Sequence, residues 1–300
     1  MRINAKTIKN ISMALIALFV MVTAGQVKAQ DYPVGTEGIK GATVPPPGFY
    51  YVLYTKYYEA DKTYDKDGDE INNGFDLSAF IMANRFVYIT NKKILGGDYG
   101  MNVIVPVVNL NVEIDAAGID DDSTDIGDIT FEPLLISWHG ERWDASTAIA
   151  AFLPTGYYEK DDAASIGSDR YTLMYSLGAT VYPDAAKLWS ISVLTRYEKH
   201  FKNRSTDVRS GDDFSFDWGI GRQVGLFELG VSGFAHWQLT EDKGSDATST
   251  DKDRLFGAGP EVQMNIPAMK GQLRLKYQKE FGAKDCAAGD AVWFTIVKSF

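Results

Sequence analysis

The sequence predicts an all-β fold, a transmembrane antiparallel up-and-down β-barrel of about twelve strands. Three observations predict it. Polar and apolar residues alternate with a period of two, long polar loops alternate with short turns, and the chain ends on a strand that finishes with Phe300. A period of two places successive side chains on opposite faces of a strand, which suits a sheet with lipid on one face and a polar lumen on the other.

Composition narrows the class of protein further. The 300-residue chain is 45% hydrophobic and 13% aromatic, and it carries a formal net charge of −10. This acidic balance argues against nucleic acid as a partner, because phosphate backbones require a basic surface. Cys286 is the only cysteine, which rules out an internal disulfide and a multi-cysteine metal site. We expect no cofactor.

The amino terminus has the layout of a secretory signal peptide. Arg2, Lys6 and Lys9 precede the apolar run 11–22, and small residues continue to Ala29. We expect cleavage after Ala29. An uncleaved anchor is the alternative, but the apolar run is short for a helix that crosses a membrane.

The chain therefore divides into a signal peptide at 1–29, a lead at 30–48 and a barrel at 49–300. The lead is rich in Gly and Pro and ends in Pro-Pro-Pro-Gly, a composition that favours an extended backbone. It is interpreted as a periplasmic lead, a small plug in the bore or a simple linker. Because the barrel would be exported and cross a membrane with strands alone, the predicted location is the bacterial outer membrane.

Strands separated by two kinds of connection account for the rest of the chain. Long polar loops such as 60–74 and 155–169 alternate with short turns such as 90–93 and 139–142. This sorting by length is typical of outer-membrane barrels, and a soluble sandwich, the alternative, has no reason to show it. Loops are also expected at 115–125 and 282–290. The predicted strands are 49–58, 75–89, 99–112, 129–138, 143–153, 171–181, 188–199, 214–220, 226–239, 255–266, 272–281 and 291–300.

The polar face of these strands supplies the candidates for lining the lumen. Acids and bases are mixed on it, so that opposite charges facing each other across a narrow bore would pair and constrict it. The candidates are Glu132, Arg196, Glu198, Asp217, Glu228, His236, Glu261, Arg274, Lys276 and Glu280.

Some presumed inward positions are apolar instead. Phe80, Met82 and Phe234 fall on them, and the strand at 99–112 is apolar on both faces. Packing inside a small barrel explains this pattern. The more specific hypothesis is a partly apolar passage for hydrophobic small molecules.

Signals for catalysis and for metal binding are weak. No zinc-protease, serine-hydrolase or phosphate-loop motif occurs, and His236 on a polar face is the one residue that suggests a lipid-modifying barrel hydrolase. Asp65, Asp67 and Asp69 alternate as in a calcium loop, but Glu70 replaces the glycine that such a loop requires. We expect at most weak binding of divalent cations there.

Several segments resemble one known family. The runs G-T-E-G-I-K-G-A-T-V-P-P-P-G-F-Y (35–50), Y-T-K-Y-Y-E-A-D (54–61), I-L-G-G-D-Y-G (94–100), V-I-V-P (103–106) and G-D-I (127–129) carry the likeness. Together they resemble the phenol-degradation meta-pathway family of outer-membrane proteins. The resemblance implies a secreted barrel that helps aromatic or hydrophobic compounds to cross the outer membrane, and it implies no catalytic residues.

The expected function is passive uptake of small, hydrophobic or aromatic compounds by an outer-membrane channel, not an enzyme. A structural or adhesive barrel that acts through its acidic outer loops is the alternative. The expected partners are the lipid bilayer and lipopolysaccharide, a small hydrophobic permeant, and the barrel-assembly machinery, which would recognise the last strand with its terminal Phe300.

Overall fold

The computed structural model describes residues 31–160 and 162–300. The expected signal peptide lies outside the described residues. Within them, no helix is long and apolar enough to cross a membrane.

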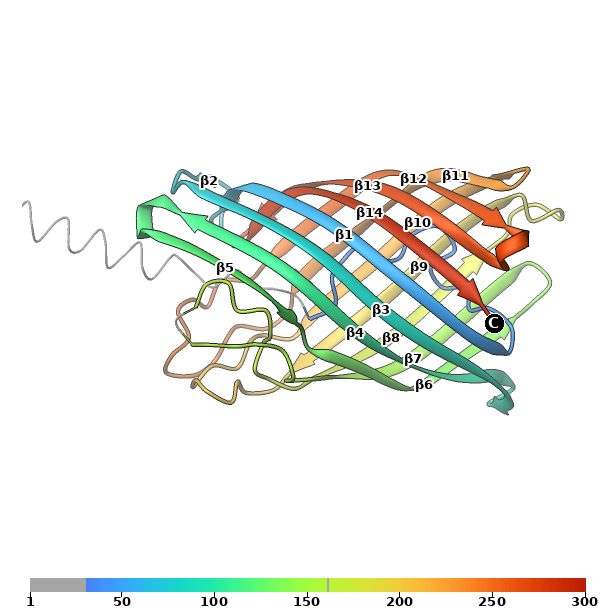
Figure 1. Cartoon of the computed structure of the whole chain (residues 1–300), viewed down its shortest axis with the longest axis horizontal. Coiled ribbons are helices and arrows are strands. Elements are labelled where there is room, and N and C mark those ends of the chain that lie inside the picture. Colours follow the sequence, from blue (N-terminus) through green and yellow to red (C-terminus); the bar gives the residue numbers. More distant parts are fainter. Residues whose placement is uncertain (1–30, 161) are drawn as a thin grey trace, which may run out of the picture.

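Twelve strands close into one antiparallel barrel (Figure 1). Each pairs with its neighbours along the chain, and β14 pairs with β1 from Tyr50↔Ser299 to Thr63↔Ala287, which shuts the sheet. The fold class predicted from sequence is therefore confirmed. The barrel strands are β1 (Gly48–Tyr64), β3 (Phe75–Ile94), β4 (Gly97–Ile114), β6 (Ile129–His139), β7 (Trp143–Leu153), β8 (Thr172–Val181), β9 (Trp189–His200), β10 (Asp213–Val224), β11 (Phe227–Gln238), β12 (Arg254–Ile266), β13 (Gly271–Lys284) and β14 (Ala287–Ser299).

The two ends of the barrel differ. Short turns, including Leu95–Gly96 and the 3-10 turn η2 (Pro267–Met269), gather at the end that also holds the C-terminus, at the right of Figure 1. We call this the turn end. The opposite end, called the loop end, carries the long connections at 154–171, 201–212 and 239–253. Leu95 and Gly96 both have positive φ, the backbone that tight hairpins require.

Two predicted loops contain strand instead. Residues 115–125 form a 3-10 turn, η1 (Asp115–Ala117), and then β5 (Ile119–Ile126), which pairs with the outer part of β4. The pairing of β4 with β6 stops at Ile104↔Thr130, so the rest of β4 would be an open edge without β5. A shorter strand, β2 (Glu70–Ile71), lies in the predicted loop 60–74 and pairs with the last residues of β1, Thr63 and Tyr64.

The prediction of a long loop at 282–290 is wrong. There β13 and β14 extend toward each other and leave only Asp285 and Cys286 between them. Asp285 adopts a left-handed backbone at φ 51°, which makes the hairpin tight.

The strands have an apolar outer face and a polar inner face. In β9, Trp189 and Ile191 point outward and are 44% and 42% exposed, whereas Ser190, Ser192 and Arg196 are buried inside. The side chains exposed here would contact acyl chains in a bilayer, and the buried polar groups face one another across the lumen.

The inward placement of Phe80 and Met82 is wrong. Both lie on the outer face of β3 and are 40% and 37% exposed. In this strand the inner face is apolar too, with Phe75, Leu77 and Ala79 in a buried cluster, so alternation could not tell the faces apart. Phe234 is buried inside the barrel, as predicted.

Candidate functional site

Residues 31–47 run through the inside of the barrel as a chain of turns and irregular backbone, and we call this segment the plug. Its first described residue, Asp31, contacts Thr172 and His200, which lie where β8 begins and β9 ends at the loop end. The plug reaches the turn end where β1 begins at Gly48. It therefore crosses the whole length of the lumen, and it appears as a blue trace behind the front strands in Figure 1.

Side chains of the wall accept hydrogen bonds from the plug backbone. The two carboxylate oxygens of Asp217 accept from the N–H groups of Gly35 (2.9 Å) and Glu37 (3.0 Å). Glu261 accepts from the N–H of Ile39 at 3.1 Å. Within the plug, the N–H groups of Gly41 and Thr43 donate to the carbonyls of Gly38 and Lys40 at 2.9 Å, in two turns. The acids of the wall supply acceptors for N–H groups that lie outside these turns.

The plug carbonyls are satisfied by donors from the same side of the wall. The ammonium group of Lys276 donates to the carbonyls of Gly35, Thr36 and Glu37. Gln263 donates to the carbonyl of Ile39 at 2.9 Å. Side chains of β10, β12 and β13 thus satisfy donors and acceptors of the plug backbone, as the backbone of a neighbouring strand would do in a sheet.

Close packing against β10 requires glycine on both sides. A Cβ added to Gly219 would lie 2.4 Å from the carbonyl carbon of Gly38. A Cβ added to Gly38 would lie 2.0 Å from a carboxylate oxygen of Glu261. The plug backbone lies directly on the wall here, because neither residue carries a side chain.

Glu37 is the charged centre of the plug. It accepts a hydrogen bond from the hydroxyl of Tyr54 at 2.9 Å and lies 3.4 Å from Arg85 and 3.9 Å from Arg274. Arg85 also reaches Glu132 at 3.5 Å. Acids and bases therefore alternate across the middle of the lumen and hold one another in place.

A cavity of about 140 Å³ remains beside the plug. Its lining extends from Val44 and Val297 near the turn end to Met174 near the loop end. Apolar side chains from several strands meet there with the charged groups around Glu37. The wall residues are Tyr50, Val52, Tyr54, Arg85, Val87, Ile104, Thr130, Glu132, Leu135, Ser146, Ala148, Met174, Ser176, Leu194, Arg196, Arg274 and Val297.

The ten predicted lumen residues lie in three groups. The first touches the plug or its charged centre, and consists of Asp217, Glu228, Glu261, Arg274 and Lys276. The second lies beside the cavity and consists of Glu132 and Arg196. The third lies toward the loop end, where Glu198 and His236 share a small space and Glu280 binds the hydroxyl of Tyr58 at 2.8 Å.

Sequence reasoning missed the plug's own contribution. Tyr32 packs under the guanidinium of Arg196, 4.2 Å from its ring centroid, and Glu37 organises the central charges. Arg85 was also missed, although an arginine in the mostly apolar run 79–89 was a signal that could have identified the inner face of β3.

The aspartates at 65–69 do not gather around a common point. One carboxylate oxygen of Asp65 accepts the N–H groups of Asp67, Gly68 and Asp69, each at 2.9 Å. These bonds, with that from Asp69 first, hold the pKa of Asp65 below its usual range. Asp67 pairs with Lys66 at 2.6 Å instead. The geometry therefore gives Asp65 a role in shaping the turn and offers no calcium loop.

The surroundings of His236 leave no room for a substrate. The space that it shares with Tyr32, Val34, Asp213 and Ser215 has no volume for even one water molecule. The plug fills the lumen where a hydrolase would need an open site. The lipid-modifying reading has no support in this geometry.

Comparison with known proteins agrees with this architecture. The family described as "Putative MetA-pathway of phenol degradation" matches residues 60–296. No curated protein matches the sequence.

Three solved structures share the fold at low sequence identity. The COG4313 outer membrane channel from Pseudomonas putida F1 is 14% identical, with a TM-score of 0.76 over 90% of this chain and 100% of that one. The translocator domain of autotransporter NalP from Neisseria meningitidis is 10% identical, with a TM-score of 0.52 over 97% of this chain and 98% of that one. The transport unit of the autotransporter AIDA-I from Escherichia coli is 10% identical, with a TM-score of 0.51 over 94% and 97%.

Proposed function

Because the chain belongs to the family of the MetA pathway of phenol degradation, we propose that it is an outer-membrane channel. In this proposal it admits small hydrophobic or aromatic compounds by passive diffusion. The observation that carries the proposal is the cavity between the plug and strands β1, β3, β4, β6 to β9, β13 and β14. The similarity of the fold to an outer membrane channel from Pseudomonas putida supports the same reading.

The size and lining of the cavity favour a permeant of about one aromatic ring. An engineered cavity of roughly 150 Å³ in another protein binds benzene, and this one measures about 140 Å³. Val52, Ile104, Leu135 and Met174 offer apolar contact. The charges nearby are already paired, which lowers the cost of leaving them beside an apolar guest. A permeant would move along the apolar wall while the ion pairs around Glu37 stay in place.

Flux measurements test this proposal directly. Proteoliposomes carrying the folded protein should swell in small aromatic carboxylates faster than in disaccharides, which are too wide for the cavity. Planar bilayers should show ion current that aromatic solutes interrupt. If neither flux nor current depends on the protein, the chain is a non-transporting barrel and the proposal fails.

We predict that Met174→Trp lowers aromatic flux several-fold, because a larger ring on the inner face of β8 would occupy the cavity. Val193→Trp is the matched control, since Val193 points outward toward lipid and is 41% exposed. Swelling rates of the two variants, measured on equal amounts of folded protein, give the comparison. Equal flux through both would place the passage elsewhere in the barrel.

We propose further that the exposed surface of the barrel binds three partners in the outer membrane: the lipid bilayer, lipopolysaccharide and the barrel-assembly machinery. The outward apolar side chains would contact the bilayer, and the exposed acids of β5, which include Asp120 and Asp122, would face lipopolysaccharide at the loop end. The terminal Phe300 is 70% exposed beside Phe49, at a ring distance of 5.6 Å. Its backbone N–H donates to the carbonyl of Phe49 at 3.1 Å, and most of the ring stays exposed. In this proposal the barrel-assembly machinery recognises the exposed ring.

We predict that Phe300→Ala reduces the amount of assembled barrel in cells but scarcely changes refolding of the purified chain in detergent. The exposed ring contact is worth about 0.5–1.5 kcal/mol, which is small for a sheet already closed along β1 and β14. Heat-modifiable mobility on gels measures the folded fraction in both settings. An equal loss in detergent would mean that Phe300 acts through the seam and not through recognition.

A further inference from the structure

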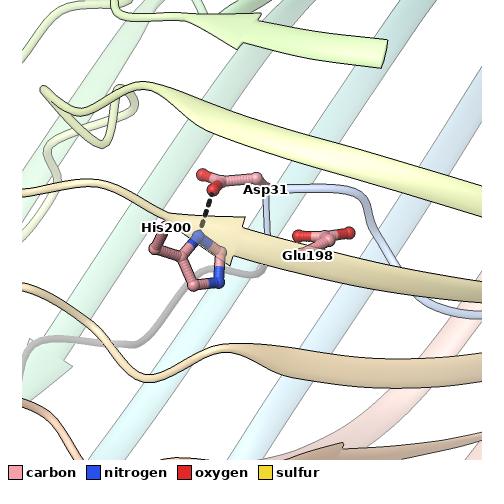
Figure 2. Close-up of side chains that lie close together, drawn as sticks. All are labelled: Asp31, Glu198 and His200. Carbon is pink, nitrogen blue, oxygen red and sulfur yellow. Dashed lines mark ion pairs between the residues drawn. The ribbon is translucent and has the colours of Figure 1, made fainter. Parts of the chain in front are cut away.

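A cluster of possible metal ligands lies where the plug meets the loop end. Asp31 comes from the plug, and Glu198 and His200 come from the last three residues of strand β9, on its inner face (Figure 2). The potential ligand atoms all lie within 4.8 Å of one another. All three side chains are almost completely enclosed.

The cluster has an excess of negative charge. Three carboxylates, those of Asp31, Glu198 and Asp213, surround His200. Among residues 31–160 and 162–300, the permanent cation that pairs with them is Arg170, 3.2 Å from Asp31. Arg196, also near Glu198, is already paired with Asp217 at 2.9 Å.

Glu198 itself is incompletely satisfied. One of its carboxylate oxygens is buried and has no hydrogen-bond partner. A buried carboxylate in this state must be neutralised by a proton or by a cation. This unpartnered oxygen belongs to the same carboxylate that completes the ligand group.

The geometry around His200 favours a cation. Its Nδ1 lies 3.1 Å from a carboxylate oxygen of Asp31, a spacing that two ligands of one zinc ion can adopt, since zinc bonds measure about 2.0–2.2 Å. Its Nε2 lies 3.1 Å from Asp213. A carboxylate on the far nitrogen is the usual arrangement that orients a metal-bound imidazole.

We propose that Asp31, Glu198 and His200 bind a divalent transition-metal ion of the zinc class. One imidazole nitrogen and two carboxylate oxygens form a ligand set that suits such ions. Since Asp31 belongs to the plug and the other two ligands to the wall, the ion ties the outer end of the plug to β9. Binding through Nδ1 of His200 requires two groups to give up their contacts with this nitrogen, the Thr172 hydroxyl at 2.9 Å and the Arg170 guanidinium at 3.4 Å. The proposal concerns binding alone and stands independently of transport.

Equilibrium dialysis of the folded, chelator-treated protein against zinc chloride tests it, with bound metal measured by mass spectrometry. We expect one zinc per chain, lost on Glu198→Gln and on His200→Gln. Asp213→Asn should weaken binding roughly 10–100-fold, and Arg170→Gln should strengthen it by removing the competing cation. Asp69→Asn, in an outer loop, is the control that should bind as the parent does.

Two results would overturn the proposal. One is the absence of bound zinc in the parent chain, in which case Glu198 is neutralised by a proton. The other is undiminished binding by both Glu198→Gln and His200→Gln, which would make the metal adventitious. Heat-modifiable mobility on gels shows whether each variant is folded. If Glu198→Gln or His200→Gln does not fold, the zinc binding of Asp213→Asn is used in its place, and undiminished binding by that variant would overturn the proposal.

Discussion

Deleting residues 31–47 is expected to raise single-channel conductance several-fold. The plug crosses the entire lumen and lies directly on the wall at Gly38 and Gly219, so its removal converts a filled bore into an open one. The deletion also removes two acidic residues and one basic residue from the lumen. The reversal potential in a salt gradient should therefore shift toward anions as the current increases.

Planar-bilayer recording of the deletion variant and the parent measures both effects. Residues 1–30 and residues from Gly48 onward stay in the chain, so the strands that close the sheet are preserved. Shortening the loop at 239–253 is a suitable control, because it removes chain from the loop end and leaves the plug in place. An unchanged conductance after the deletion would show that residues 31–47 do not limit passage.

Asp217→Ala is expected to lower the free energy of unfolding by about 3–5 kcal/mol, the usual cost of removing one partner of a buried ion pair. Arg196, which pairs with Asp217 at 2.9 Å, is as deeply buried as its partner and would lose the carboxylate that it contacts directly. The backbone N–H groups of Gly35 and Glu37 would lose their acceptors at the same time. The plug should loosen, so channel noise should increase along with the loss of stability.

Thermal unfolding in detergent, followed by heat-modifiable mobility, measures this loss. Glu70→Gln is the control, because it breaks an exposed pair with Lys62 that water already screens. Adding Arg196→Met to Asp217→Ala should restore much of the stability, since apolar replacement of a buried pair is often neutral. A loss no larger than that of the control would show that the pair is solvated in the lumen.

The sequence predicts the strands best where chemistry differs between the two faces. In β9, β10 and β13 most residues on the inner parity are polar, so the lumen residues Arg196, Asp217 and Lys276 could be chosen from the alternation. In β3 and β4 both faces are apolar, because the inner face packs against itself near the loop end. Phe80 and Met82 were assigned to the wrong face for that reason.

The plug could not be placed from sequence. Its composition of Gly and Pro suits a linker as well as an extended segment inside a barrel, and it has no alternation to show a buried face. Its partners are also remote. Gly35 binds Asp217, 182 residues away, and Lys276 binds the carbonyl of Gly35 across 241 residues. On the plug side these contacts use backbone N–H and carbonyl groups, which nearly all residues have, so no pattern of side chains in the plug predicts them.

The path of the plug also constrains the order of biogenesis. Asp31 is held at the loop end and Gly48 lies at the turn end, so the barrel wall encloses this segment over its full length. That wall closes only when the last strand, β14, pairs with the first, β1. Either the hairpins assemble around a segment already laid along them, or the segment is drawn lengthwise through a finished cylinder. A crosslink that joins β14 to β1 before the inner segment docks would separate these two routes, since only the second survives premature sealing.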